Sequence, residues 1–292
     1  MSKEEKVSFY SGIHRLTGLL RLPSTNERSP AVIFLQGSEY TSPLNSRFLM
    51  RISDYLIDHG IACLIFNKRG VGDSSGSKWK CTFEDRANDA LAALDFMKTR
   101  KEIDAAMIGL FGHSQGGWIC QLAATKSSEM AFIINSAGPG ESVFEQILTD
   151  SRNHLIIDGV PENKVNKKIG QIALLLKLIL KLKPIIKFHP LSYMIDYDPK
   201  PIIGSINCPV LALFGELDPL TPPTKNIPIF EEAFKRAGKN NYVIKTFPKA
   251  NHSFYLAKTG SLKEYSQLTK EFVPYYLETI TDWILSNTKQ VD

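Results

Sequence analysis

Short apolar runs alternate along the first half of the chain with segments in which apolar residues recur at helical spacing. Such runs predict buried strands, and the segments between them predict amphipathic helices. The strands are expected at Val7–Tyr10, Leu16–Leu22, Ala31–Leu35, Ile61–Phe66, Met107–Phe111, Ala131–Asn135, Val210–Phe214 and Tyr242–Thr246. The helices are expected at Phe48–Asp58, Asp85–Thr99, Trp118–Lys126, Ile227–Ala237 and Phe272–Ser286. The alternation predicts an α/β fold, a mostly parallel sheet flanked by helices on both faces.

The alternation breaks between about Glu141 and Ile206, where helical patterns replace strand patterns. In open α/β sheets, ligands bind outside the carboxyl ends of the strands, so a helical insertion is best interpreted as a cap over that edge. We expect residues 1–140 and 207–292 to form the main α/β domain. Residues 141–206 are expected to form the helical cap.

The composition is that of a globular protein. Of its 292 residues, 43% are hydrophobic and 22% are charged, enough to bury one large core with an inserted subdomain. The net charge of +5 is modest, and the basic residues are interspersed with 30 acidic ones, which gives nucleic-acid binding little support. The oligomeric state stays open, a homo-oligomer included.

The sequence shows no signal-peptide or membrane-spanning pattern. Residues 1–6 include two glutamates and lead directly into a strand pattern, and no run reaches the roughly 18 apolar residues needed to cross a bilayer. The four cysteines lie far apart in or beside apolar segments, without the paired spacing of a zinc site. We expect a cytoplasmic protein with reduced core cysteines, no stable membrane insertion and no metal.

The stretch "GHSQGG", Gly112–Gly117, lies between the strand pattern that ends at Phe111 and a helical pattern. Glycines at this spacing also occur in ordinary turns. At a strand-to-helix junction, however, G-x-S-x-G is typical of a nucleophile elbow, where a sharp turn raises the serine hydroxyl above the sheet edge. Gly112 and Gly116 provide the room that such a crowded turn requires. We therefore predict Ser114 as a catalytic nucleophile.

A serine hydroxyl becomes a useful nucleophile when a histidine accepts its proton and an acid holds that histidine. On this kind of fold the chain order is serine, acid, histidine. Only His252 follows the strand that is expected to carry the acid. The other five histidines precede the serine, adjoin it or lie in the insertion: His14, His59, His113, His154 and His189. We predict His252 as the base and Asp218 as the acid, because Asp218 lies beyond the strand and before Pro219; Glu216 is the alternative.

Attack on a carbonyl creates an oxyanion, which preorganised backbone N–H groups stabilise. One predicted donor is the amide of Gln115, the residue after the nucleophile. The other is expected in the loop after the strand Ala31–Leu35, where Gly37 lets the backbone come close and Ser38 supplies the N–H. A plain strand-ending turn is the alternative interpretation of this loop.

Taken together, these residues give a chain that resembles the α/β-hydrolase superfamily, specifically cytosolic esterases related to dienelactone hydrolases and the catalytic domain of prolyl-oligopeptidase-type enzymes. The likeness runs from about residue 15 to the C-terminus and rests on five ordered motifs: "FLQGS", "NKRGVGDSSG", "GHSQGG", "CPVLALFGELD" and "FPKANHSF". It implies that Ser114, Asp218 and His252 are catalytic, with the oxyanion held by the Ser38 and Gln115 amides. One departure is Gln36-Gly37, where many relatives have His-Gly.

A second glycine-rich loop, Gly70–Gly76, loosely resembles a dinucleotide-binding loop. That interpretation requires glycines that connect a strand directly to a helix. Here Asn67–Arg69 precedes them and Trp79–Thr82 separates them from the next helix. The segment instead matches the Arg-Gly-x-Gly loop of hydrolases, so we expect no cofactor.

Residues 171–188 of the predicted cap combine leucine and isoleucine with four lysines: Lys177, Lys181, Lys183 and Lys187. A basic amphipathic helix can lie on an anionic membrane, or it can cover an apolar pocket with its lysines outward. Its place in the insertion favours the second interpretation, and an apolar underside would suit acyl chains or aryl groups. The candidates for lining that pocket are Phe188, Tyr193 and Met194.

These features predict a serine hydrolase that cleaves carboxylic esters of small to medium, apolar substrates through an acyl-enzyme intermediate. A peptidase or acyl-thioesterase of the same fold is the first alternative. Peptidase action is disfavoured because about 30 residues before the sheet core leave no room for the gating propeller of oligopeptidases. The alternative of another class is a hydrolase fold retained for ligand binding, which the complete set of Ser114, Asp218 and His252 opposes.

Overall fold

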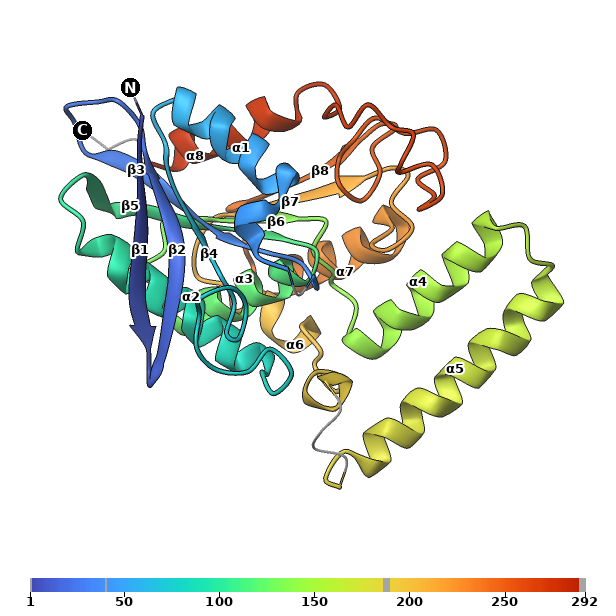
Figure 1. Cartoon of the computed structure of the whole chain (residues 1–292). Coiled ribbons are helices and arrows are strands. Elements are labelled where there is room, and N and C mark those ends of the chain that lie inside the picture. The colour runs from blue at the N-terminus through green and yellow to red at the C-terminus, as the bar shows by residue number, and fades with distance from the viewer. Residues whose placement is uncertain (1, 40, 186–189, 289–292) are drawn as a thin grey trace.

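Eight strands form one sheet in the computed structural model, which describes residues 2–39, 41–185 and 190–288 (Figure 1). Their order across the sheet is β1-β2-β4-β3-β5-β6-β7-β8. The pairs β1–β2 and β2–β4 are antiparallel, and all the other pairs are parallel. The strands are β1 (Lys3–Ser11), β2 (His14–Leu22), β3 (Ser29–Leu35), β4 (Ala62–Phe66), β5 (Ile103–His113), β6 (Ile133–Ser136), β7 (Val210–Gly215) and β8 (Tyr242–Phe247). The predicted mostly parallel sheet is confirmed.

Helices cover both faces of this sheet, as the continuous apolar strand sequences require. Every residue of β4 and β7 is buried. The flanking helices are η1 (Pro43–Asn45), α1 (Arg47–Asp58), α2 (Phe83–Lys98), α3 (Gln115–Lys126), α7 (Pro223–Arg236) and α8 (Tyr276–Asn287). Helices α1 and α8 enclose a core cluster on one face, and α2, α3 and α7 enclose the other (Figure 1).

Helix α8 begins later than its apolar pattern predicts. The pattern places its start near Phe272, whereas the helix begins at Tyr276. Pro274 lacks a backbone donor, and Tyr275 adopts a left-handed backbone with φ of 66°. Phe272 instead forms an isolated bridge with Tyr255, which pairs two parts of the long loop between β8 and α8.

The segment between β6 and β7 is helical in its described part, as predicted. It contains α4 (Val143–Ile157), α5 (Glu162–Leu182), η2 (Pro190–Tyr193) and α6 (Lys200–Ile203). A capping box starts α4: the Ser142 hydroxyl accepts from the Glu145 amide, and the Glu145 carboxylate accepts from the Ser142 amide. Helices α4 and α5 form a hairpin that projects from the sheet, with α4 on its inner side (Figure 1). The division into a main domain and a cap stays a prediction.

The loops that carry the predicted site residues follow parallel strands and meet at one edge of the sheet. Ser38 follows β3, Ser114 follows β5, Asp218 follows β7 and His252 follows β8. The carboxyl ends of parallel strands form the usual ligand-binding edge of such sheets. The sheet therefore brings residues that are distant in sequence to one place.

The structure also bears on the expectations from composition. No helix in the described ranges is long and apolar enough to cross a membrane. Cys63, Cys81, Cys120 and Cys208 are all buried and unpaired, as predicted. Burial raises the pKa of the Cys63 and Cys208 thiols to about 12, so both stay protonated near neutral pH.

Candidate active site

Ser114 occupies a sharp turn between β5 and α3. Its backbone φ of 55° lies in the left-handed region that serine rarely adopts, which is typical of a strained functional turn. The neighbouring glycines make the turn sterically possible. A Cβ on Gly112 would lie 2.2 Å from the carbonyl oxygen of Gly116, and one on Gly116 would lie 2.0 Å from that of Leu35. The predicted role of these glycines is confirmed, and α3 begins directly after Ser114 at Gln115, earlier than its apolar pattern predicts.

Asp218 and His252 meet from the loops that follow the paired strands β7 and β8. His252 Nδ1 and Asp218 Oδ2 form a hydrogen bond of 2.7 Å. The Asp218 side chain is fully buried, and its Oδ1 accepts hydrogen bonds from the amides of Leu220 at 2.8 Å and Thr221 at 3.1 Å. One carboxylate oxygen is thus anchored by the backbone while the other holds the imidazole ring.

Burial and mutual attraction shift the pKa values of Asp218 and His252 in opposite directions, and the attraction is the stronger effect. Burial raises the pKa of Asp218, but the neighbouring His252 and hydrogen bonds from His252 and Thr221 outweigh it and hold the pKa below its ordinary value. Burial lowers the pKa of His252, but Asp218, with smaller contributions from Asp150 and Glu39, raises it above 6.5 overall. The pair therefore favours an ionised carboxylate beside a ring that holds its proton readily.

The alternative acid and the neighbouring histidine take other roles. Glu216 is exposed and accepts a hydrogen bond of 2.8 Å from the Lys249 amide. His113 Nε2 lies 3.0 Å from the carbonyl oxygen of His252, so the neutral ring can donate to that loop. Burial, followed by the proximity of His252, lowers the pKa of His113 to about 3. His113 is thus neutral near physiological pH and fits a loop-holding role.

The loop of His252 is shaped by Asn251, to which sequence reasoning gave no structural role. The buried Asn251 side chain accepts hydrogen bonds from the amides of Ser253 and Tyr255, both at 3.0 Å. An asparagine next to the predicted base, followed by a sharp turn, is the signal that could have identified it. Asn251 therefore holds the short polar loop that carries the imidazole.

Ser114 and His252 line the same cavity of about 280 Å³. In the described residues the Ser114 hydroxyl forms no hydrogen bond with the His252 ring. Contacts of this kind are often long without substrate and tighten when substrate binds. The structure thus brings the predicted nucleophile and base to one space, with the acid bonded behind the base.

The two predicted oxyanion donors lie next to Ser114. A Cβ on Gly37 would come within 3.3 Å of the Ser114 Cβ, a tight contact, so glycine eases the close approach of the loop after β3. Gln115 is the first residue of α3, where an amide has no intrahelical acceptor. The amides of Ser38 and Gln115 donate to no other group among the described residues. Both are therefore available to an incoming oxyanion.

A half-buried lysine and a buried arginine brace these donors, and sequence reasoning missed both. Lys68 Nζ donates to the backbone oxygen of Glu39 at 2.9 Å and also to that of Gly37. Arg86 donates to the side-chain oxygen of Gln115. Burial, together with the nearby Arg86, lowers the pKa of Lys68 well below its usual value. A lysine two residues after a buried strand, in "NKRG", was the available signal for this role.

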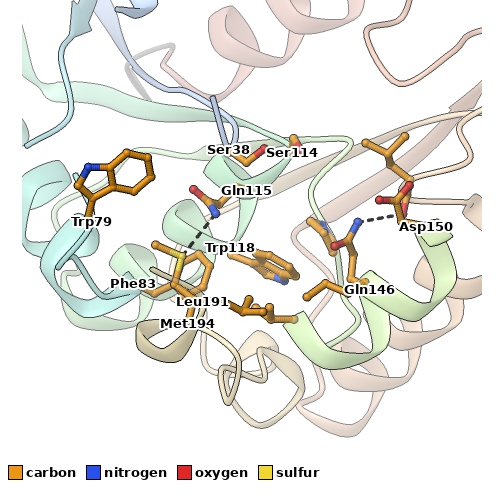
Figure 2. Close-up of a pocket in the computed structure, with 14 residues that line it drawn as sticks. Ser38, Trp79, Phe83, Ser114, Gln115, Trp118, Gln146, Asp150, Leu191 and Met194 are labelled. Carbon is orange, nitrogen blue, oxygen red and sulfur yellow. Dashed lines mark hydrogen bonds between the residues drawn. The ribbon is translucent and has the colours of Figure 1, made fainter. Parts of the chain in front are cut away.

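A second cavity of about 410 Å³ is also lined by Ser114 (Figure 2). It shares Ser38, Ser114 and Leu220 with the first cavity. Apolar side chains dominate its wall: Phe83, Trp118, Pro139, Val143, Ile147, Leu191, Met194 and Leu220, with Trp79 at one end. Volume and lining are those of a site for a small molecule.

The predicted pocket residues have three different outcomes. Met194 lines the larger cavity, and its Sδ lies 3.7 Å from Gln115 Nε2 (Figure 2). Tyr193 packs against the core cluster beside the cavity. Phe188 lies outside the described residues. The residues that the insertion contributes to the cavity wall come from α4 and residues 191–194. Among the described residues none of α5 lines the cavity, contrary to the expectation that the lysine-rich helix covers the pocket.

Asp150 on α4 places a carboxyl group in the wall of the larger cavity, opposite Trp79 (Figure 2). Its Oδ1 is buried and lies 3.0 Å from His154 Nε2, without the geometry of a hydrogen bond. Burial raises the pKa of Asp150, although His154 and His252 oppose that shift. The sequence offered no specific signal for this residue, because its importance depends on where α4 lies over the sheet.

No cluster of three or more His, Cys, Asp or Glu side chains suited to a metal ion occurs in the described ranges. In the loop after β4, Arg69 pairs with Asp85 at 2.9 Å and Asp89 at 2.8 Å. A Cβ on Gly70 would lie 2.5 Å from the Lys78 amide nitrogen. The glycines of this loop thus serve its tight folding around a structural arginine.

Two family profiles match separate parts of the chain. The serine aminopeptidase S33 family matches residues 43–147, which include Ser114. The dienelactone hydrolase family matches residues 170–276, which include Asp218 and His252. The two matches together contain the predicted nucleophile, acid and base, which the structure brings to one edge of the sheet.

Known proteins are similar to this chain in two ways: in sequence over part of its length, and in structure over nearly all of it. Human mitochondrial palmitoyl-protein thioesterase ABHD10 is 27% identical over 137 residues, 46% of this chain and 42% of the thioesterase, so the chain spans less than half the length of that relative. An esterase of Pyrococcus furiosus superposes with a TM-score of 0.66 at 15% identity, covering 98% and 92% of the two chains. Est1E of Butyrivibrio proteoclasticus, with ferulic acid bound, gives 0.59 at 18% identity and 96% coverage of both. These similarities establish the fold.

Proposed function

Since this chain belongs to the α/β-hydrolase superfamily and has its fold, we propose that it is a serine hydrolase that cleaves carboxylic esters with apolar acyl groups of small to medium size. The observation that carries the proposal is the hydrogen-bonded pair of Asp218 and His252 at a cavity that also contains the strained Ser114. A purely structural turn has no need of a serine in the left-handed region, whereas a nucleophile held out of the sheet does.

His252 acts as the general base in the first half of the reaction. Its Nδ1 donates to Asp218, so Nε2 is free to take the proton of Ser114 as Oγ attacks the ester carbonyl carbon. The carbonyl oxygen gains the negative charge, and the amides of Ser38 and Gln115 stabilise it. The bond to the alcohol then breaks, and His252 protonates the departing oxygen. The acyl group stays on Ser114.

Water completes the second half by the same groups in reverse roles. His252 takes a proton from the water as its oxygen attacks the acyl carbonyl, and the same two amides hold the new oxyanion. The bond to Ser114 Oγ breaks, and His252 returns the proton to that oxygen. The carboxylic acid leaves and the free enzyme is restored.

The two cavities indicate how the substrate is oriented at Ser114. The departing oxygen must lie near His252, which lines the smaller cavity with polar neighbours such as Glu39, Asn251 and Ser253. The acyl group then extends into the larger cavity, where Phe83 and Trp118 present apolar surface. We infer a substrate with an apolar acyl group and a more polar leaving group. The buried Oδ1 of Asp150 suits a hydroxyl or ammonium group on the acyl side.

Thioesters and peptides are the alternative substrates of the same machinery. The partial similarity to a protein named as a palmitoyl-protein thioesterase supports the thioester, because the acyl-enzyme step is common to both. The match to the serine aminopeptidase family supports a peptide bond. Retention of the fold for ligand binding alone is the alternative of another class. The buried, unpaired cysteines support the inferred cytoplasmic location, since a reducing compartment keeps thiols free.

A substrate panel tests the proposal. The purified chain is assayed on p-nitrophenyl esters, acyl thioesters and aminoacyl-naphthylamides, with Ser114→Ala as the matched control. We expect the highest kcat/KM on esters of apolar acids and no turnover by the variant. Higher kcat/KM on thioesters or naphthylamides would favour the respective alternative. Turnover that never exceeds that of Ser114→Ala would overturn the enzymatic proposal.

A further inference from the structure

Helix α5 has an apolar outer face that no described part of the chain covers. Its inner face packs against the core cluster through residues such as Ile172 and Leu176. The outer side of the α4–α5 hairpin points away from the sheet (Figure 1). The exposed apolar side chains are Leu174 (71%), Leu175 (56%) and Leu178 (50%), followed just beyond the helix by Ile185 (75%).

The spacing of these leucines makes them one surface. Leu174 and Leu178 are four residues apart and so lie one above the other on the helix, with Leu175 beside them. Single exposed apolar residues are common on protein surfaces, but a contiguous stripe of leucine marks an interaction site. The helix is therefore apolar on two opposite sides, and one of those sides is covered by α4.

Lysines surround this stripe. Lys177 and Lys181 each follow a stripe leucine by three residues, and Lys167 precedes Leu174 by two helical turns. The exposed lysines of the helix are Lys164, Lys167, Lys168, Lys177 and Lys181. Within the described residues none of these five forms an ion pair, and Glu162 is the sole acidic residue of α5. The face is thus both apolar and strongly positive.

We propose that the outer face of α5 docks on an anionic membrane surface. The leucines would enter the boundary between headgroups and acyl chains, and the lysines would contact lipid phosphates, with the helix parallel to the surface. This is peripheral binding. An anionic membrane surface offers apolar acyl chains below negatively charged headgroups. A leucine stripe with flanking lysines is complementary to both.

The charge pattern argues against self-association as the occupant of this face. Two copies joined through α5 would bring two sets of five uncompensated lysines together, and like charges at close range disfavour such contact. An anionic bilayer supplies the opposite sign over an extended plane. Membrane docking does not depend on the proposed function, but it would place the larger cavity near the bilayer. Helix α4, which packs on the inner side of α5, carries Ile147 and Asp150 of that cavity.

Vesicle flotation of the whole chain tests the docking. The vesicles are phosphatidylcholine alone or phosphatidylcholine with about a third phosphatidylserine. We expect binding to the anionic vesicles that weakens at high salt, and little binding to the neutral ones. Leu174→Gln/Leu178→Gln and Lys177→Gln/Lys181→Gln should each abolish most of it, the latter by roughly fivefold for each lysine removed. All four side chains are exposed, so these variants should fold.

The control variant carries Ile13→Gln and Lys101→Gln, which are exposed elsewhere on the molecule. It should bind like the wild type. Absence of binding by the wild-type chain, or equal binding by the α5 variants, overturns the proposal. A concentration-dependent dimer that Leu174→Gln/Leu178→Gln dissociates, without vesicle binding, would assign the face to self-association instead. Because the readout is binding, it is independent of hydrolysis by Ser114.

Discussion

The imidazole of His252 is bonded at 2.7 Å to the carboxylate of Asp218, a group that is itself fully buried and fixed by two backbone amides. This relationship has two consequences. It fixes the tautomer of the ring, because Nδ1 must carry the donated proton and Nε2 is left as the acceptor. It also raises the pKa of His252, since the ionised carboxylate stabilises the charged ring more than burial destabilises it.

The first prediction concerns the pH dependence of kcat/KM. A general base must be neutral in the free enzyme, and the folded pKa of His252 lies above 6.5, so activity should rise with pH through a midpoint above 6.5. Asp150 contributes to that raised value. Asp150→Asn should therefore move the midpoint to lower pH. Asp158→Asn, an exposed change at the end of the same helix, should leave the pH profile unchanged.

Removal of the acid is the second prediction. Asp218→Asn keeps the shape of the side chain but removes the charge that holds the correct tautomer, so kcat should fall about 10⁴-fold. Glu216→Gln, in the same loop, should retain nearly full activity because Glu216 is exposed and bonded to the Lys249 amide. Steady-state kinetics on a p-nitrophenyl ester give both values. Comparable losses in the two variants would show that Asp218 is not the acid partner.

Lys68 provides the third prediction. Its side-chain Nζ holds the loop that carries the Ser38 amide, so Lys68→Met should lower kcat by roughly tenfold or more while KM changes little. Lys68→Arg retains donors to the same carbonyl groups and should recover part of the loss. Lys101→Met, at an exposed site, is the control for removal of a lysine. A change confined to thermal stability would assign Lys68 a purely structural role.

The fourth prediction concerns the acyl group. Ile147 lines the larger cavity, so Ile147→Trp should fill it and shift the preference among p-nitrophenyl esters toward shorter acyl chains. Ile156→Trp, on the same helix but outside this cavity, should keep the wild-type preference. The ratio of kcat/KM for acetate and octanoate esters measures the shift. An unchanged ratio in Ile147→Trp would mean that acyl chains bind elsewhere.

Features that depend on the local chain path were predictable from sequence. The apolar runs identified the strands, and the glycines around Ser114 identified a turn whose crowding the structure reproduces. The order of the strands then explains why Asp218 and His252 meet, because the loops after β7 and β8 are neighbours. Pro274 and Tyr275 illustrate the limit of periodicity, since they delay a helix whose apolar spacing starts earlier.

Features that depend on tertiary packing were not predictable in the same way. Lys68 acts on Gly37, 31 residues away in sequence, and no local pattern relates the two. Asp150 matters because α4 lies beside the cavity, which periodicity does not specify. The lysine-rich helix α5 was expected to turn its leucines inward over the pocket. Ile172 and Leu176 do pack inward, but Leu174 and Leu178 lie on the opposite side of the helix and are exposed.

The central claim, that Ser114 is the nucleophile of a working triad, is tested most directly by a fluorophosphonate probe and peptide mapping of the labelled site. The wild-type chain should gain one phosphonyl group on Ser114. Ser253→Ala, which alters another serine of the same cavity, should label equally, while Ser114→Ala should not label and His252→Ala should label far more slowly. Wild-type labelling no greater than that of Ser114→Ala, or a label on another residue, would contradict the account.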